Sequence, residues 1–284
     1  MKVLISADME GTCGVSSWTH VTPPEYGEAG SSTAEYERAR LRMTREVNAA
    51  IEGAYEGGAT EVIVNDSHDG MRNLIAEELD VRCRFITGND KPLGMMQGVD
   101  IADVGAVFYT GYHAKAGTPG APLAHTWTGW VNDVRVNGIS TGEFGINSIV
   151  AGHFGTPVVL ATGDDKAVDQ VKTWCGDHVV TVAVKEGIST FAAIHLHPSR
   201  AQDLIREGAK GAVKKAKRSK PFVLPANSLI EIDFDHQTRA DQTIYVPGVT
   251  RGGERTIVYR PDDGLDFIYT FRAIIKAASV RMVP

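Results

Sequence analysis

Short apolar runs alternate with segments of helical periodicity through the first half of the chain. The opening run, Val3-Leu4-Ile5, has the length of a buried strand. From residue 34 to 56, apolar side chains recur at helical spacing and two glycines follow, which predicts a long amphipathic helix and its end. The same pattern predicts strands at 61–65, 83–87, 106–110 and 157–162, and helices at 71–79 and 143–153. Such alternation indicates an α/β fold with a mostly parallel sheet flanked by helices.

The pattern changes after about residue 165. Predicted beyond it are a strand near 179–184, a helix near 198–217, a strand near 229–234 and a closing helix near 265–280. Before it, Asn137-Gly138 between two alternating runs is a hairpin turn signal. We therefore expect two domains, a Rossmann-like α/β lobe of residues 1–164 and a smaller α/β lobe of residues 165–284.

Two carboxylates, Asp8 and Glu10, follow the first predicted strand directly. Residues two apart in an extended chain point the same way, so both carboxylates can face one spot. Like charges held that close repel each other unless a cation lies between them. Ligand sites of open α/β sheets lie at the carboxyl ends of the strands. The motif favours a metal site, and the alternative is a solvated strand end with two unrelated acids.

Similar side chains follow other predicted strands. They are Asp66 and His68 after the second strand, His113 after the fourth, Glu143 before a helix, and His125 after a Thr-Pro-Gly turn. Carboxylates and imidazoles are the usual non-thiol zinc ligands. Taken singly, each has an ordinary alternative, such as a helix-start acid for Glu143 or a turn or capping residue for Asp66. Their recurrence at strand ends favours a metal-binding first domain.

Five of these groups suit a two-metal site: Asp8, Glu10, His68, His113 and Glu143. Three carboxylates and one bridging hydroxide offset the charge of two divalent ions, which matters because an uncompensated buried charge is costly. The ligand types suit zinc and would also accept manganese or cobalt. We expect Asp66 either to orient a ligand imidazole or to cap the turn.

Four segments resemble the signature segments of one known family. These are Ser6-Ala7-Asp8-Met9-Glu10-Gly11, Val64-Asn65-Asp66-Ser67-His68, Gly111-Tyr112-His113-Ala114 and Gly142-Glu143. Their order and spacing are similar to those of the DppA-type D-aminopeptidases, which are binuclear zinc peptidases linked to dipeptide transport. The resemblance covers nearly the whole chain and implies that Asp8 bridges two zinc ions, with the other four ligands completing their coordination. It also implies that His125 is an additional active-site histidine.

The resemblance further implies a homo-oligomer, a decamer-like ring whose sites face an inner chamber and admit short peptides. The loop from residue 12 to 32 is longer than is usual in the family, and Trp127 and Trp130 add bulk beside His125. We expect these features to shape the substrate pocket.

The expected activity is hydrolysis, by a metal-bridged hydroxide, of short peptides with a free N-terminal D-amino acid. His125 would act as general acid or base, or as a donor to the oxyanion. One alternative is a metal-dependent amidase acting on small L-amino-acid amides. Another is a non-catalytic protein that binds metal or peptide.

Composition excludes several other classes. Apolar residues make up 43% and charged residues 23% of the 284 positions, which is ordinary for a globular protein. The formal charge of −6 gives no reason to expect nucleic acid or an anionic membrane as a partner, and the basic stretch 210–220 fits a solvated helix face. No apolar run approaches the length of a membrane span. Three widely spaced cysteines predict no disulfide framework and favour the cytoplasm, with Cys13 as a packing residue.

Overall fold

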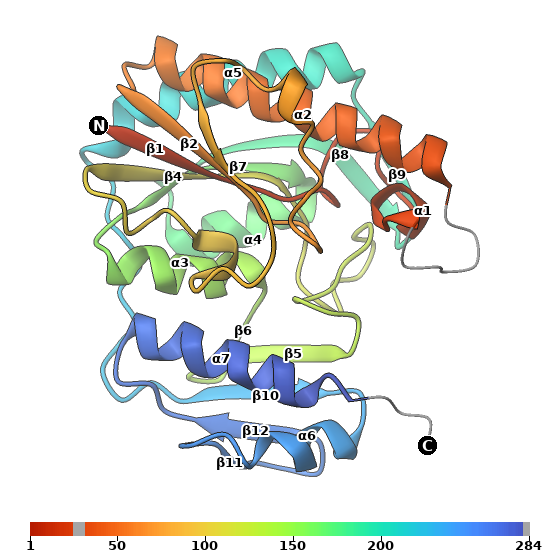
Figure 1. Ribbon diagram of the computed structural model, residues 1–284, viewed down its shortest axis with the longest axis vertical. Coiled ribbons are helices and arrows are strands. Elements are labelled where there is room, and N and C mark those ends of the chain that lie inside the picture. The colour runs from red at the N-terminus through yellow and green to blue at the C-terminus, as the bar shows by residue number, and fades with distance from the viewer. Residues whose placement is uncertain (25–31, 281–284) are drawn as a thin grey trace.

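The computed structural model describes residues 1–24 and 32–280, and its larger part is a seven-stranded sheet (Figure 1). The strands are β1 (Lys2–Ala7), β2 (Glu61–Asp66), β3 (Arg84–Ile86), β4 (Val104–Tyr112), β7 (Val158–Asp164), β8 (Val180–Ser189) and β9 (Ala192–His195). Their order across the sheet is β3-β2-β1-β4-β7-β8-β9. All neighbours pair in parallel except β9, which runs antiparallel to β8. The mostly parallel sheet expected from the sequence is confirmed.

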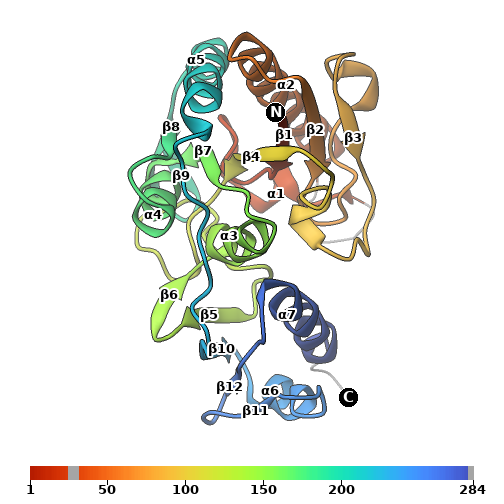
Figure 2. The ribbon, with the colours of Figure 1, turned by 90° about the vertical axis from the view of Figure 1, so that its left-hand side faces the viewer.

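Helices cover both faces of this sheet (Figure 2). They are α2 (Thr33–Glu56) and α5 (Pro198–Ala216) on one face, and α3 (Glu143–His153) and α4 (Asp165–Cys175) on the other. Successive residues of β1 point to opposite faces, so Val3 and Ile5 pack in the core under α2 and α5 while Leu4 packs in the core under α3 and α4. This burial on both sides explains the continuous apolar run of the strand.

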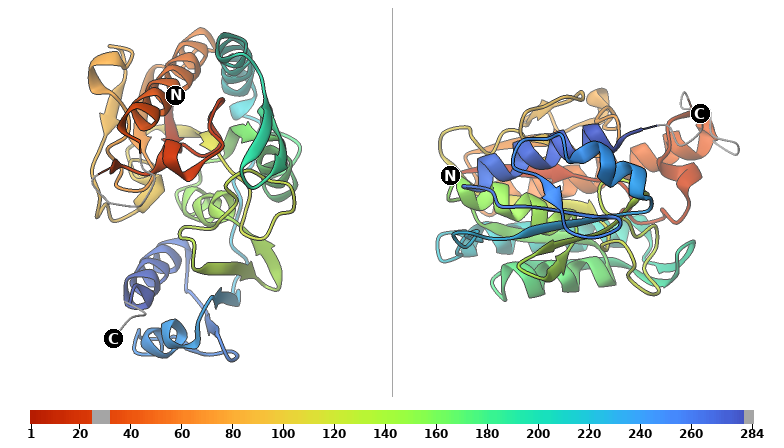
Figure 3. Two further views of the ribbon diagram at one scale, coloured as in Figure 1. Left: turned by 90° about the vertical axis from the view of Figure 1, so that its right-hand side faces the viewer. Right: turned by 90° about the horizontal axis from the view of Figure 1, so that it is seen from below.

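A second sheet of five antiparallel strands lies at the opposite end of the molecule from α2 and α5 (Figures 1 and 3). It contains β5 (Val131–Val136), β6 (Ile139–Thr141), β10 (Ile230–Phe234), β11 (Thr250–Arg251) and β12 (Thr256–Tyr259), with α6 (Gln237–Thr243) and α7 (Gly264–Ala278). The order is β11-β12-β10-β5-β6. As expected, Asn137 and Gly138 form the tight turn between β5 and β6, and both have positive φ angles. Helix α7 packs against α3, which joins the two units.

The expected domain boundary after residue 164 does not follow the sheets. Strand β8 extends the first sheet by pairing with β7, whereas the hairpin of β5 and β6 leaves that sheet and pairs with β10. The second unit is therefore built from two separate stretches of chain. Hydrophobic periodicity identifies strands but carries no record of which strands pair.

The helix predicted at 71–79 is also wrong, since only a short 3₁₀ turn, η2 (Ala76–Glu78), forms there. The carboxylate of Asp66 accepts the backbone N–H groups of Asn73 and Leu74, at 2.5 and 2.7 Å, and so fixes an irregular turn. Within residues 1–24 and 32–280, no helix is long and apolar enough to cross a membrane.

Candidate metal centre

The candidate ligands meet at the carboxyl edge of the first sheet, where β1, β2 and β4 end side by side. Asp8 and Glu10 follow β1, His68 follows β2, His113 follows β4, and Glu143 begins α3. All five side chains are buried. The structure thus brings together residues from four parts of the chain, as the strand-end pattern predicted.

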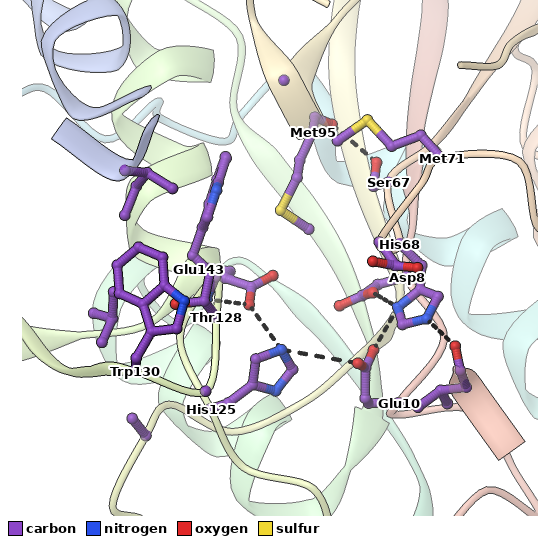
Figure 4. Close-up of a pocket in the computed structure, with 18 of the residues that line it drawn as sticks. Asp8, Glu10, Ser67, His68, Met71, Met95, His125, Thr128, Trp130 and Glu143 are labelled. Carbon is purple, nitrogen blue, oxygen red and sulfur yellow. Dashed lines mark hydrogen bonds and ion pairs between the residues drawn. The ribbon is translucent and has the colours of Figure 1, made fainter. Parts of the chain in front are cut away.

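The first group of ligand atoms comes from Asp8, Glu10 and His68. The Nδ1 atom of His68 lies 3.3 Å from Asp8 Oδ1 and 3.0 Å from Glu10 Oε2. Figure 4 shows the three side chains pointing toward one another. Potential ligand atoms of all three lie within 4.8 Å of one another, close enough to bind one ion.

The second group shares Asp8 with the first. The Nε2 atom of His113 lies 3.5 Å from Asp8 Oδ2 and 3.2 Å from Glu143 Oε1. Potential ligand atoms of Asp8, His113 and Glu143 also lie within 4.8 Å of one another. Asp8 therefore offers one carboxylate oxygen to each group, which is the arrangement of a ligand that bridges two ions.

Each of three imidazoles is tied to a backbone carbonyl on the side away from the carboxylates. His68 Nε2 contacts the carbonyl of Val21 at 2.8 Å, His113 Nδ1 that of Ala114 at 3.0 Å, and His125 Nδ1 that of Leu123 at 2.9 Å. A carbonyl only accepts hydrogen bonds, so these nitrogens carry the protons. In a neutral ring the other nitrogen then presents a lone pair to the carboxylates. Such second contacts fix the tautomer and orientation of metal-binding histidines.

The electrostatics of the cluster also fit metal ions. Among the described residues, Asp8 Oδ2 and Glu10 Oε2 are buried and accept no hydrogen bond, although His113 Nε2 and His68 Nδ1 lie 3.5 and 3.0 Å from them. Burial and the neighbouring Glu10 raise the pKa of Asp8 to about 8. Burial alone would lower the pKa of His113, but Glu143 and Asp8 raise it to about 10. Without cations, protons on Asp8 and on the imidazoles offset the charge of the carboxylates, and divalent ions between the carboxylates would take the place of those protons.

His125 lies beside the two groups, and with Glu10 and His113 it forms a third set whose potential ligand atoms lie within 4.8 Å of one another. Its ring stacks on His113 with centroids 4.1 Å apart. Its Nε2 atom is 3.8 Å from Glu10 Oε1 and 3.7 Å from Glu143 Oε1, and Figure 4 shows it between these carboxylates. Burial and the neighbouring His113 lower the pKa of His125, which favours the neutral ring. Because its side chain is 16% exposed, against 2% for His113, it faces the cavity and can reach a bound molecule.

A cavity of about 1170 Å³ opens over the cluster. Trp127 and Trp130 line it, as the sequence led us to expect. The backbone N–H of Trp127 also donates to Glu143 Oε1 at 2.7 Å, so this residue holds a ligand as well as shaping the wall. The tryptophan rings pack against Phe271 and Phe234 of the second unit, which places the cavity between the two units.

Asp66 takes the capping role that the sequence left open. Its carboxylate bonds to the backbone and side chain of Asn73 and to the backbone of Leu74. The side chain of Asn73 in turn donates to the carbonyl of His68 at 2.6 Å. Asp66 therefore positions the loop that carries His68 and does not bond to its imidazole.

The loop from residue 12 to 32 contributes residues that the sequence analysis missed, while residues 25–31 lie outside the described part. Its short helix α1 (Trp18–Val21) supplies the carbonyl that holds His68. The ring of Trp18 packs edge-on against His125, with centroids 5.4 Å apart, and lines the cavity. No sequence motif marks a backbone carbonyl, so the role of Val21 could not be predicted.

Lys185, at the end of the apolar run of β8, was also missed. It is fully buried, and its Nζ donates to the carbonyls of Glu10, Thr12 and Val15, the last at 2.7 Å. It therefore fixes the backbone on which Glu10 stands. A lysine directly after an apolar strand is a signal that could have drawn attention to it.

Two other features have the ordinary roles expected. Cys13 is buried, its Sγ donates to the carbonyl of Leu196, and burial raises the pKa of its thiol to about 11, so it is a packing residue. The basic stretch lies at the end of α5, where Lys214 and Lys215 are exposed and Val213 is buried. This is a solvated helix face.

A parallel α/β sheet with a shared carboxylate, two ligand groups and a further imidazole at its carboxyl edge defines a metal-dependent hydrolase. A profile of the Peptidase_M55 family, described as D-aminopeptidase, matches residues 1–273. A D-aminopeptidase of Bacillus subtilis (strain 168) is 36% identical over 267 residues, which cover 94% of this chain and 93% of that protein. A solved structure described as Zn-dependent D-aminopeptidase DppA from Bacillus subtilis, a self-compartmentalizing protease, matches with a TM-score of 0.91 and 32% identity over 100% of both chains.

The chain belongs to the M55 family of D-aminopeptidases. Its fold and its activity as a metal-dependent D-aminopeptidase agree with the expectation from the four sequence segments.

Proposed function

We propose that the protein removes the N-terminal D-amino acid from short peptides with two zinc ions bound between the sheet edge and α3. The observation that carries this proposal is the position of Asp8, whose two carboxylate oxygens face two separate ligand groups. Glu10 and His68 would hold one ion, and His113 and Glu143 the other. The description of the DppA structure as Zn-dependent supports the choice of zinc.

Two ions in these positions would supply an activated water at neutral pH and polarise the scissile carbonyl. The protein's own contribution begins with His125, whose neutral Nε2 accepts a proton from the attacking water. The same nitrogen returns that proton to the leaving amine as the peptide bond breaks. The carbonyl of Leu123 keeps Nδ1 protonated, so Nε2 is the nitrogen that takes up and returns the proton. Trp18 packs edge-on against His125, and it lines the cavity together with Trp127.

The test is to strip the protein of metal, refill it with zinc, manganese or cobalt, and assay D-alanine and L-alanine p-nitroanilides together with D- and L-dipeptides. We expect about two zinc ions per chain, loss of activity on chelation, and a preference for D-residues. Full activity after exhaustive chelation would contradict the mechanism. Preference for the L-anilide would favour an L-amidase, and no hydrolysis by any metal form would favour a binding protein.

We further propose that the protein forms a ring-shaped homo-oligomer, decamer-like as the family resemblance implies. The description of the DppA structure as a self-compartmentalizing protease supports assembly. The hairpin of β8 and β9 at the sheet edge exposes Ile188, Phe191 and Ile194, each about 60% exposed, and apolar groups gathered on one edge are typical of an interface. Light scattering on the wild type and on Phe191→Lys/Ile194→Lys tests this, since the double variant should lose subunits.

The cytoplasm is the compartment we propose. Cys13, Cys83 and Cys175 are all free thiols, which suits a reducing environment. The measurement is fractionation of the native host with detection of the untagged protein.

A further inference from the structure

The wall of the cavity opposite the sheet edge belongs to the second unit. One side of α7 lines it with Arg272, Ile275 and Lys276, at positions spaced three and four apart on a helix. The segment around Asp90 and Lys91 lines it next to α7. A substrate whose amino end lies at the metal centre therefore extends toward a wall that carries positive charge.

Three cations line this part of the cavity, and two of them bond to polar groups of neighbouring residues. Lys91 is buried, and its Nζ donates to Asn65 Oδ1 and the carbonyl of Asp66, both at 2.6 Å. Lys276 pairs with Asp90 at 2.8 Å. Lys91 therefore supports the local structure, and Asp90 offsets the charge of Lys276.

Arg272 differs from both. Within the described part of the chain it forms no ion pair, and its one hydrogen bond runs from Nη1 to the carbonyl of Pro92, at 2.9 Å. A guanidinium has five N–H donors in a planar fork. The bond to Pro92 anchors the side chain and leaves the other donors for a ligand in the cavity. The group that matches this fork is a carboxylate, which binds two parallel N–H groups.

A peptide hydrolysed from its amino end carries such a carboxylate at its other end. We propose that Arg272 binds the free C-terminal carboxylate of the substrate and thereby selects short peptides with an unblocked C-terminus. This inference rests on the proposed peptidase function and adds a residue that determines specificity. The candidate metal centre would act on the N-terminal amide bond, while Arg272 of the second unit binds the C-terminal end of the same peptide.

The experiment compares each peptide with its C-terminal amide. D-Ala-Ala and D-Ala-Ala-Ala are assayed as free acids and as amides by the release of D-alanine, with the zinc-loaded wild type and Arg272→Gln. At the length that reaches Arg272, we expect the wild type to favour the acid by about tenfold in kcat/KM, since a charged hydrogen-bonded pair is lost in the amide. Arg272→Gln should lower kcat/KM for the acid about tenfold, mainly through KM, and leave the amide within about twofold.

Two further variants separate charge from structure. Arg272→Lys keeps the charge without the fork and should show an intermediate ratio of acid to amide. Arg255→Gln is the matched control, because Arg255 also donates to a backbone carbonyl, that of Asp235, but does not line the cavity. It should keep the wild-type ratio.

Equal rates of the wild type on acid and amide at both lengths would overturn the inference, whatever the variants do. So would an Arg272→Gln protein that loses activity on acid and amide by the same factor. Failure of the proposed function looks different, because a zinc-loaded wild type would then release D-alanine from neither form.

Discussion

At the carboxyl edge of the first sheet, His68, His113 and His125 are each bonded to a backbone carbonyl, whereas α7 on the opposite wall presents side chains with few such ties. The two regions face the same cavity. Buried groups held by the main chain keep fixed positions, which suits reacting groups. Arg272, a half-buried arginine on α7, can be replaced without moving the histidines that the backbone carbonyls hold. The comparison indicates that the chemistry belongs to the first sheet and the choice of substrate to the second unit.

The largest effect is expected from removing the shared ligand. Asp8→Asn keeps the size of the side chain and removes the charge that both groups use, so both ions should be lost and activity should fall to background. Metal analysis and the D-alanine p-nitroanilide assay measure this. Asp100→Asn, at a solvent-exposed position, is the control. Retention of two zinc ions in Asp8→Asn would show that this carboxylate does not bridge.

The next effect separates proton transfer from metal binding. His125→Asn should lower kcat by about 10²- to 10⁴-fold, the usual contribution of a general acid or base, while the zinc content stays near that of the wild type. His153→Asn, at the end of α3 and away from the cavity lining, should change neither. Loss of zinc together with activity would make His125 a ligand instead.

An intermediate effect is expected where the backbone of the site is held. Lys185→Met removes the ammonium group from three carbonyls next to Glu10, so zinc affinity should fall about 10- to 100-fold, as for other groups that support ligands. Titration with a competing chelator measures it. Lys166→Met removes an exposed lysine and should have no such effect. If Lys185→Met binds zinc with wild-type affinity, the backbone that carries Glu10 does not need the ammonium group to keep its position.

A smaller effect is expected at the cavity wall. Trp18→Ala should raise KM by up to about tenfold, since it removes an aromatic part of the cavity wall whose contact with a bound substrate would contribute roughly 0.5–1.5 kcal/mol, and should leave zinc content unchanged. Steady-state kinetics with D-dipeptides measure it. A fall in kcat with constant KM would instead assign Trp18 to the alignment of His125.

The smallest effect is expected on the second sheet. Ile139 of β6 is 64% exposed, so Ile139→Lys should change the free energy of unfolding by less than about 0.5 kcal/mol and leave activity as it is. Urea unfolding followed by fluorescence measures the first. A loss of several kcal/mol would show that this face is covered in the assembled protein.

Features of the site and fold that depend on a local sequence pattern could be predicted from the sequence. Asp8 and Glu10 follow an apolar strand at a spacing that puts them on one side, and this spacing favoured a cation over two unrelated acids. Asn137-Gly138 likewise identified its hairpin because that turn needs residues that tolerate positive φ.

What depended on tertiary pairing was not predictable in this way. The contact of Val21 with His68 joins residues 47 positions apart through a backbone atom, and that of Lys185 with Glu10 spans 175 positions. The pairing of β5 with β10 across the stretch between them was not predictable for the same reason, so the sheets do not follow the expected boundary near residue 164. Local sequence patterns predict secondary structure, whereas the contacts between distant segments depend on the tertiary fold.

The division of the second sheet between two distant stretches has a consequence for synthesis. Arg135 of β5 and its partner Glu231 of β10 are 96 positions apart, so a ribosome delivers β5 and β6 long before the strand they pair with. In the finished sheet, Val134 and Val136 of β5 pair with Ile232 and Ile230 of β10. The nascent chain therefore contains all five candidate metal ligands before α7 and its Arg272 have been made, so the part of the cavity wall that α7 supplies is completed last.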